Sequence, residues 1–367
     1  MDINYRMLDT HSSDEIRQWH ELFRISFNTS ISESTWNWKY LHNPVRNEER
    51  PLIYIAESSD SIVGSVFFQP MQFWLQSDGQ KVIVPAGLVG NAMVHPDFRN
   101  LGIFSALLKN VMNDATGEGF NILYTFANNP ISRRGFLRHN WTEVMDSEAY
   151  MYFLNPQQAL HDFLSDKRYP AFMRSIPTIV PTKRIDFRSF QRHRQKYHFS
   201  CGKVQDYLSA IEQIHTNYQE AERISGARNQ KYLQWLFGDP ERRYLFFGMW
   251  LKEELHAYIV VRQVDSSTSD MQKSALIEDS FSLTKKTSLD SRLFSYMVAQ
   301  LRDHQFMKIS GTFFPEGPLG LSPLFKGFIP RRKKWTLMYW VAEEDPIADD
   351  LQNNVNWDLH EVDAFAL

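Results

Sequence analysis

The sequence has almost no cysteine, no long apolar run and no excess of either charge. Cys201 is the only cysteine among 367 residues, so no disulfide can form within the chain, and no base that would activate Cys201 as a catalytic thiol is apparent. Lys plus Arg (40) nearly balances Asp plus Glu (43), which argues against a nucleic-acid partner. No apolar run approaches the ~18 residues that span a bilayer, and Met1–Arg6 is unlike a signal peptide. We therefore expect a cytoplasmic protein without a membrane or nucleic-acid partner.

The length and the aromatic content favour two packed domains. A chain of 367 residues exceeds the size of one typical core, and 27 Phe, 15 Tyr and 10 Trp supply enough large apolar groups for two. We expect a first domain in residues 1–155, a connector in 156–200, a second domain in 201–345 and a tail in 346–367.

The clearest local pattern lies in residues 89–108. An apolar run ends at Pro96, and apolar residues at helical spacing resume after Gly102, which predicts a strand, a loop and a helix. The loop at 97–101 leads into the free N–H groups of the helix N-terminus, and Arg99 adds a positive charge. Such a loop suits a phosphate or a diphosphate.

The segment 99–104 resembles the pyrophosphate loop of the GNAT superfamily of acyl-CoA-dependent N-acyltransferases, written Gln/Arg-x-x-Gly-x-Gly/Ala. Five of the six positions conform, and Phe104 stands where a small residue is usual. In the GNAT fold the fourth and fifth strands splay apart, and the pantetheine arm of the acyl-CoA hydrogen-bonds into the gap. By this resemblance, the residues that bind acetyl-CoA or a longer acyl-CoA are Ala92, Met93, Val94, Arg99, Asn100, Leu101, Gly102, Ile103, Phe104, Asn128 and Asn129.

Further helices and strands are predicted around this unit. Residues 13–27 carry an apolar face at helical spacing behind a cap at Ser12 or Ser13, and residues 35–44 predict a short aromatic helix that ends at its proline. Trp36 and Trp38 in this short helix either pack in the core or stack on a ligand. The remaining predictions are a helix at 132–140 and strands at 52–56, 61–68, 72–75, 81–84, 89–94, 121–127 and 150–154.

The second half of the chain repeats this order of elements. Residues 231–240 echo residues 36–44, whereas residues 284–289 contain no glycine, so the second copy should not bind CoA. We predict an α/β (α+β) protein with two GNAT-like domains in tandem, each a mixed, mostly antiparallel sheet flanked by helices. The predicted elements of the second copy are a helix at 289–301 and strands at 244–249, 255–262, 275–283, 308–314 and 335–341.

The resemblance implies direct attack of a substrate amine on the acyl-CoA thioester, with no covalent enzyme intermediate and no metal. The backbone N–H groups from Asn91 to Met93 are the expected oxyanion donors. A base is expected at Glu278 or Asp279, two carboxylates in an otherwise apolar strand; alternatively, they pair with an arginine across the domain interface. Members of the superfamily often carry a tyrosine acid on the helix at 132–140, but this sequence has none there.

The acceptor is implied by a second, shorter resemblance. Residues 36–40, Trp-Asn-Trp-Lys-Tyr, with Asn43-Pro44, resemble a branch of tandem GNAT proteins that acylates nucleotide-linked amino sugars. This implies a monomeric enzyme that acylates a dTDP- or UDP-linked amino sugar for surface polysaccharide or O-antigen synthesis. The alternatives are acylation of a peptide, aminoacyl or antibiotic amine, and a non-catalytic acyl-CoA-binding module. The expected acceptor-binding residues are Trp36, Trp38, Tyr40, Tyr244, Arg262 and Arg331.

Overall fold

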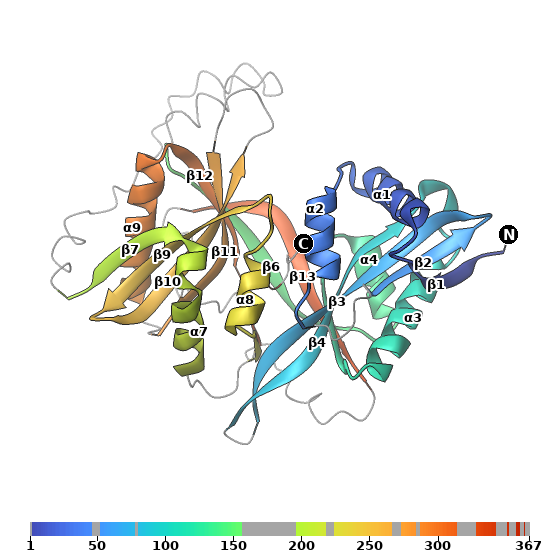
Figure 1. The fold of residues 1–367 in the computed structure, drawn as a ribbon, viewed down its shortest axis with the longest axis horizontal. Coiled ribbons are helices and arrows are strands. Elements are labelled where there is room, and N and C mark those ends of the chain that lie inside the picture. The colour runs from blue at the N-terminus through green and yellow to red at the C-terminus, as the bar shows by residue number, and fades with distance from the viewer. Residues whose placement is uncertain are drawn as a thin grey trace, which may run out of the picture.

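A computed structural model gives the structure of the chain (Figure 1). Most of the predicted connector, residues 156–195, lies outside the described residues. The described residues are 2–45, 52–77, 80–155, 196–217, 224–265, 273–283, 287–313, 328–342, 351, 357–359 and 363.

The first half of the chain opens with helices and continues as a meander of strands. The predicted helix at residues 13–27 is present, and the Ser12 hydroxyl caps it by accepting from the backbone N–H of Glu15 at 3.3 Å. The elements of this half are β1 (Asn4–Met7), α1 (Ser13–Phe27), α2 (Glu33–Trp36), the π-helical turn η1 (Asn37–Leu41), β2 (Leu52–Ser58), β3 (Ser61–Ser77), β4 (Gln80–Val94), the 3-10 turn η2 (Pro96–Phe98), α3 (Ile103–Gly117), β5 (Ile122–Ala127), α4 (Pro130–Leu137) and β6 (Thr142–Phe153).

The second half shows the repeated order that the sequence predicts. Its elements are β7 (His198–Lys203), the 3-10 turn η4 (Val204–Tyr207), α7 (Leu208–Asn217), β8 (Ile224–Gly226), α8 (Gln230–Leu236), β9 (Arg243–Leu251), β10 (Glu254–Asp265), β11 (Lys273–Ser282), α9 (Thr287–Asp303), β12 (Phe306–Phe313), β13 (Ile329–Val341) and β14 (Trp357–Asp358).

Two pairs of predicted strands are each one continuous strand. The strands expected at 61–68 and 72–75 are both part of β3, and those at 81–84 and 89–94 are both part of β4. Pro70 lies opposite Gly87 and Pro85 opposite Gln72 in this hairpin. A proline removes only one donor and its φ is compatible with extended backbone, so neither residue ends its strand.

The strands of the two halves form one sheet because the halves exchange their last strands. In the described chain the strand order is β1-β2-β3-β4-β5-β13-β6-β12-β11-β10-β9-β7. β13 pairs antiparallel with β5, for example Leu337 opposite Phe126, and β6 pairs antiparallel with β12, for example Met151 opposite Ser310. The strand predicted at 150–154 falls in the expected first domain, 1–155, but β6, which contains most of it, pairs with β12 and β13 of the second half. In Figure 1, β6 and β13 run through the middle of the molecule between the two groups of helices.

Helices cover both faces of the first half's sheet. Alternating residues of β2 belong to different core clusters: Ile53 and Ile55 pack with Trp19 of α1, whereas Tyr54 packs with Leu107 of α3. The helix α1 therefore lies on one face of the sheet and α3 on the other.

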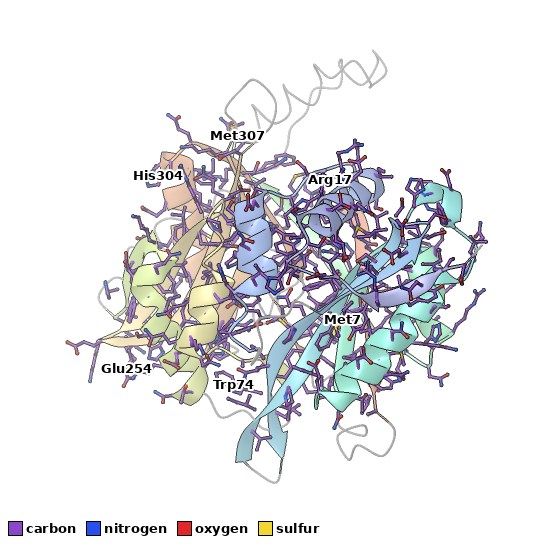
Figure 2. The ribbon with its side chains drawn as sticks, turned by 45° about the vertical axis from the view of Figure 1, so that its right-hand side comes forward. Met7, Arg17, Trp74, Glu254, His304 and Met307 are labelled. Carbon is purple, nitrogen blue, oxygen red and sulfur yellow. The ribbon has the colours of Figure 1, made fainter. Side chains whose placement is uncertain are left out.

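The two halves also share a core. The rings of Trp38 and Trp235, which occupy matching places in the repeat, stack at 5.6 Å, and each indole N–H donates to the other residue's carbonyl, at 2.7 and 2.9 Å. Trp74 of β3, labelled in Figure 2, lies 5.9 Å from the ring of His215 on α7. These reciprocal contacts are what a duplicated unit packed about an approximate two-fold axis produces.

The expected tail is part of this core where the structure describes it. Leu351, Trp357 and Leu359 are buried with residues of both halves, and β14 pairs with β8. The Asp363 side chain is fully buried. No helix in the described ranges has the length and apolar character needed to cross a membrane.

Candidate functional site

The strands β4 and β5 separate in the first half of the molecule. They pair in parallel only from Ala86 to Leu88, although β4 continues to Val94. Within that free part the register against β3 shifts at Asn91, which has a φ of 45°. This bulge turns the backbone of β4 and leaves it without a β5 partner over the described residues, so its polar groups can pair with a ligand.

A cavity of about 970 Å³ opens beside this part of β4. Residues of β4, α3, α4 and the end of α1 line it, and none of the described lining residues is a carboxylate. The volume lies at the upper end of the range for ligand pockets of roughly 300–1,000 Å³. The cavity therefore has room for a large anionic ligand.

The loop that enters α3 presents its backbone to the cavity. Gly102 is the N-cap residue, adopts a φ of 78°, and has no atom within 4 Å of the position a Cβ would take. The first turn of α3 contains no acidic residue. The N–H groups of Ile103 and Phe104 belong to the first helical turn, which lacks carbonyl partners within the helix. This arrangement suits a diphosphate.

Phe104 is accommodated by a glycine on the neighbouring helix. A Cβ on Gly135 would come within 2.5 Å of the Phe104 ring, and the rings of Phe104 and Phe136 make an edge contact at 5.3 Å. The large side chain in the last position of the loop motif therefore packs against α4, and Gly135 lets α4 approach α3 closely.

Most of the residues predicted to bind acyl-CoA lie together on this cavity. Leu101 and Asn128 are not among its lining residues, and the Asn129 carboxamide caps α4 by accepting from the N–H groups of Ile131 and Ser132. Nine of the eleven predicted residues line the cavity: Ala92, Met93, Val94, Arg99, Asn100, Gly102, Ile103, Phe104 and Asn129.

The lining residues from α1 and α4 were not predicted from the sequence. Ser26 lines the cavity, and its hydroxyl is buried without a hydrogen-bond partner in the described part of the chain. Ser105 also lines the cavity and lies 2.9 Å from Nε2 of His139, whose pKa is lowered by burial and by nearby Lys109. The charge of Arg138, on the predicted helix, could have indicated that it lines the cavity. No local sequence signal places the end of α1 at the cavity.

Asn91 contributes backbone and side chain in different directions. Its carboxamide donates to the Tyr40 hydroxyl at 2.7 Å, so the side chain points to η1. Burial raises the pKa of Tyr40, against a smaller opposing effect of this hydrogen bond. The role of the Asn91 backbone N–H as an oxyanion donor stays a prediction.

The two candidate bases are engaged in ion pairs. Asp279 is 1% exposed and accepts from Arg228 at 3.1 Å and from the Tyr258 hydroxyl at 2.9 Å. Glu278 is also 1% exposed and pairs with Arg262. Neither carboxylate lines the cavity. Both carboxylates are therefore in ion pairs, as the alternative expected, but with arginines of their own half and not across the domain interface. A fully buried, paired carboxylate has no free face for a substrate amine.

Burial also corrects the role predicted for most of the acceptor-binding residues. Trp36, Trp38, Tyr40 and Tyr244 are each at most 5% exposed, so their ring faces pack in the core and do not stack on a ligand. Burial, followed by the charge of Glu278, raises the pKa of Tyr244 to about 12. Arg262 is held by Glu278; only Arg331 of the predicted set is exposed.

Lys39 is a buried lysine beside these residues. It is 3% exposed, and its ammonium lies 5.0 Å from the ring centre of Tyr40 and 5.1 Å from that of Phe67. The described residues offer it no hydrogen bond or ion pair. Burial, and secondly the charge of Arg242, hold its pKa well below the usual value, although Asp239 acts in the opposite direction.

The separated strands, the bulge and the amide-rich start of α3 define a GNAT-like acyltransferase domain. Residues 8–142 match the protein family described as the acetyltransferase (GNAT) domain. The first half of the chain accordingly contains a GNAT-type acetyltransferase domain, and the match covers less than half of the chain. Among the described residues no cluster of His, Cys, Asp and Glu could hold a metal ion.

Solved structures with a similar fold cover nearly the whole chain. A GCN5-related N-acetyltransferase from Anabaena variabilis aligns with a TM-score of 0.58 and 14% identity, over 92% of this chain and 72% of that chain. A tandem GNAT protein from the clavulanic acid biosynthesis pathway gives 0.55 and 13%, over 94% and 100%. The N-myristoyltransferase of Saccharomyces cerevisiae, solved with myristoyl-CoA, gives 0.61 and 10%, over 94% and 80%. At these identities the likeness is one of fold. A search of curated protein sequences returned no match.

Proposed function

We propose that the protein transfers the acyl group of an acyl-CoA to the amine of a nucleotide-linked (dTDP or UDP) amino sugar. The observation that carries the acyl-CoA part is the cavity in which the free end of β4 meets the N-terminus of α3. The diphosphate would bind the loop around Gly102, and the pantetheine arm would extend β4 as an added strand. The amino-sugar part rests on the sequence resemblance of residues 36–44.

The chemistry proposed is direct attack of the neutral amine on the thioester carbonyl. The carbon–sulfur bond breaks, CoA leaves as a thiolate, and the amine loses its proton to solvent or to a water in the site. The backbone N–H groups from Asn91 to Met93 stabilise the developing oxyanion, and one such donor contributes roughly 3 kcal/mol to lowering the barrier. Binding both substrates in one orientation supplies a further part of the rate.

The proposal assigns the two halves different tasks. Residues 1–155 hold the acyl donor, and residues 201–345, with the connector at 156–200, hold the acceptor. The exposed Arg331 is the remaining candidate for the acceptor's diphosphate. In the same proposal, the enzyme acts as a cytoplasmic monomer on precursors of a surface polysaccharide or O-antigen.

A panel of acceptors tests this proposal. Purified protein is incubated with acetyl-CoA and longer acyl-CoAs and with dTDP- and UDP-linked amino sugars, and the products are identified by mass spectrometry. Product from a nucleotide amino sugar, absent with Gly102→Glu protein, supports the proposal. Peptide, aminoacyl and antibiotic amines complete the panel. Product only from one of these overturns the sugar assignment, and acyl-CoA binding without any product favours a non-catalytic module.

A further inference from the structure

Arg134 of α4 and Arg138, the C-cap residue of that helix, line the cavity and have no partner among the residues that the structure describes. Arg134 and Arg138 are exposed, and no ion pair or hydrogen bond to their guanidinium groups exists within the described residues. They are four residues apart, so they lie on the same face of the helix. Like charges at this spacing destabilise an isolated helix, so an anion between them would relieve their repulsion.

The adjacent Arg133 provides a contrast. Arg133 pairs with Glu143 of β6 through both of its fork nitrogens and does not line the cavity. This ion pair lowers the pKa of Glu143. Arg133 is thus neutralised within the protein, whereas no described residue neutralises the two arginines that line the cavity.

The diphosphate already has its own partners at the start of α3. The backbone groups after Gly102 and the charge of Arg99 serve it, and Arg99 is held in place by a hydrogen bond from Nε to the Val94 carbonyl at 3.3 Å. Arg134 and Arg138 come from a different helix, which Gly135 brings close to α3. Two further positive charges suit a second phosphate group on the same ligand.

Coenzyme A carries such a group. Besides the diphosphate it has a phosphate monoester on the 3′ oxygen of its ribose, with a charge of about −1.5 to −2 at pH 7. We propose that Arg134 and Arg138 bind this 3′-phosphate, so that the cavity selects coenzyme A over its 3′-dephospho form. This inference rests on the proposed binding of acyl-CoA in the cavity.

Calorimetric titration of the full chain at low salt tests the inference. The probes are coenzyme A and 3′-dephospho-coenzyme A, which differ only in the monoester. We expect the wild type to bind coenzyme A about tenfold more tightly, since two exposed arginine pairs each contribute little. The double variant Arg134→Gln/Arg138→Gln should lose this preference and bind 3′-dephospho-coenzyme A as the wild type does. Arg133→Gln removes a charge from the same helix and should keep the preference.

Two results would overturn the inference. Equal affinity of the wild type for the two probes would show that the monoester is not recognised. An equal loss of affinity for both probes in the double variant would mean that the arginines bind the diphosphate. Failure of acyl-CoA binding in the cavity, the part of the proposed function on which the inference rests, gives a different result, because neither probe would then bind the wild type at all. Failure of the acceptor assignment leaves the binding of both probes unchanged.

Discussion

The strands β4 and β11 hold matching places in the two halves, but their ends have different surroundings. Beyond its bulge, β4 lines a cavity through Ala92, Met93 and Val94. The register of β11 against β10 also shifts, between Val260 and Val261, and the residues there, Glu278 and Asp279, are buried in ion pairs. A register shift in the matching strand therefore accompanies a cavity in one half and a buried charge network in the other.

This difference shows how a duplicated fold can keep its backbone and change its use. A bulged strand that separates from its parallel neighbour leaves polar groups that need partners. In the first half a ligand can supply them. In the second half Arg228 and Arg262 supply charges to the side chains at the bulge, and Arg228 also pairs with Asp363 at 2.8 Å.

Separating the halves should have the largest effect. A fragment of residues 1–155 lacks β13, so the edge of β5 is unpaired and the fully buried Leu337 and Met338 are missing from its core. We expect this fragment to be unfolded or aggregated by circular dichroism and size-exclusion chromatography.

A fusion provides the matched control. Ile329 lies opposite Met151, so a short Gly-Ser linker from residue 155 to residues 328–342 would form a β6–β13 hairpin within one chain. The fusion should recover folded, monomeric protein. A fragment of residues 1–155 that unfolds cooperatively at the Tm of the full chain would contradict the strand exchange.

Replacing Arg228, the buried arginine of the second half, should have the second largest effect, a loss of folding stability. Arg228→Met leaves Asp279 and Asp363 buried without their cation, and we expect the free energy of unfolding to fall by about 3–5 kcal/mol. Arg262→Met is the control, because Arg262 is 21% exposed and its loss leaves one carboxylate without a cation, whereas the loss of Arg228 leaves two; it should cost less. Urea unfolding measures both.

Asp279→Asn separates this structural role from a catalytic one. We expect lower stability and an unchanged pH profile of kcat in the folded variant, because Asp279 is paired inside the protein. Loss of an ionisation from the kcat profile would restore Asp279 as the base.

Blocking the loop at α3 should abolish acyl-CoA binding. Gly102→Glu places a side chain and a negative charge at the diphosphate, and we expect affinity to fall about a hundredfold or more. Gly119→Glu is the matched control, because Gly102 and Gly119 both have a positive φ, 78° and 85° respectively, and open space at the Cβ position. Calorimetry should count one site per chain in the Gly119 variant. Two sites in the wild type, or binding by Gly102→Glu, would refute the asymmetry between the halves.

Lys39 should make stability depend on pH. Because burial lowers its pKa below the ordinary 10.5, the unfolded chain binds more protons than the folded chain between the two pKa values. Stability therefore rises with pH through that window, by up to about 1.4 kcal/mol per pH unit. Lys39→Met should remove this slope, whereas Lys231→Met, at an exposed position in the matching helix α8, should keep it. Unfolding curves across alkaline pH measure both, and an unchanged slope in Lys39→Met would be the contrary result.

Replacing the single cysteine should have no measurable effect. Cys201 is exposed on β7, 3.6 Å from the Gln300 side chain, and is not a residue of the cavity. Cys201→Ala should keep wild-type turnover. A stable acyl adduct seen by intact mass would contradict direct transfer.

Local patterns predicted the elements around the cavity of the first half. The helix cap at Ser12 and the strand, loop and helix in residues 89–108 follow from periodicity and turn chemistry, whereas the lining residues of β4 were expected from the GNAT resemblance. Charge alone did not reveal that Asp279 is paired, because its partner Arg228 lies fifty-one residues away in the sequence. Arg228 also binds a second carboxylate, that of the distant Asp363.

The sequence by itself determined where strands and helices form, that their order is repeated and that only one copy has a glycine in the loop before the helix. These are properties of short segments, set by side-chain spacing and by the backbone freedom of residues such as Gly102. Only the tertiary structure decided that β6 and β13 change places, that Ser26 and Arg138 share one cavity, and that Trp38 and Trp235 lock the halves together. Strand pairing and burial depend on which distant surfaces fit, and that competition among many partners is settled by the packing of the whole chain.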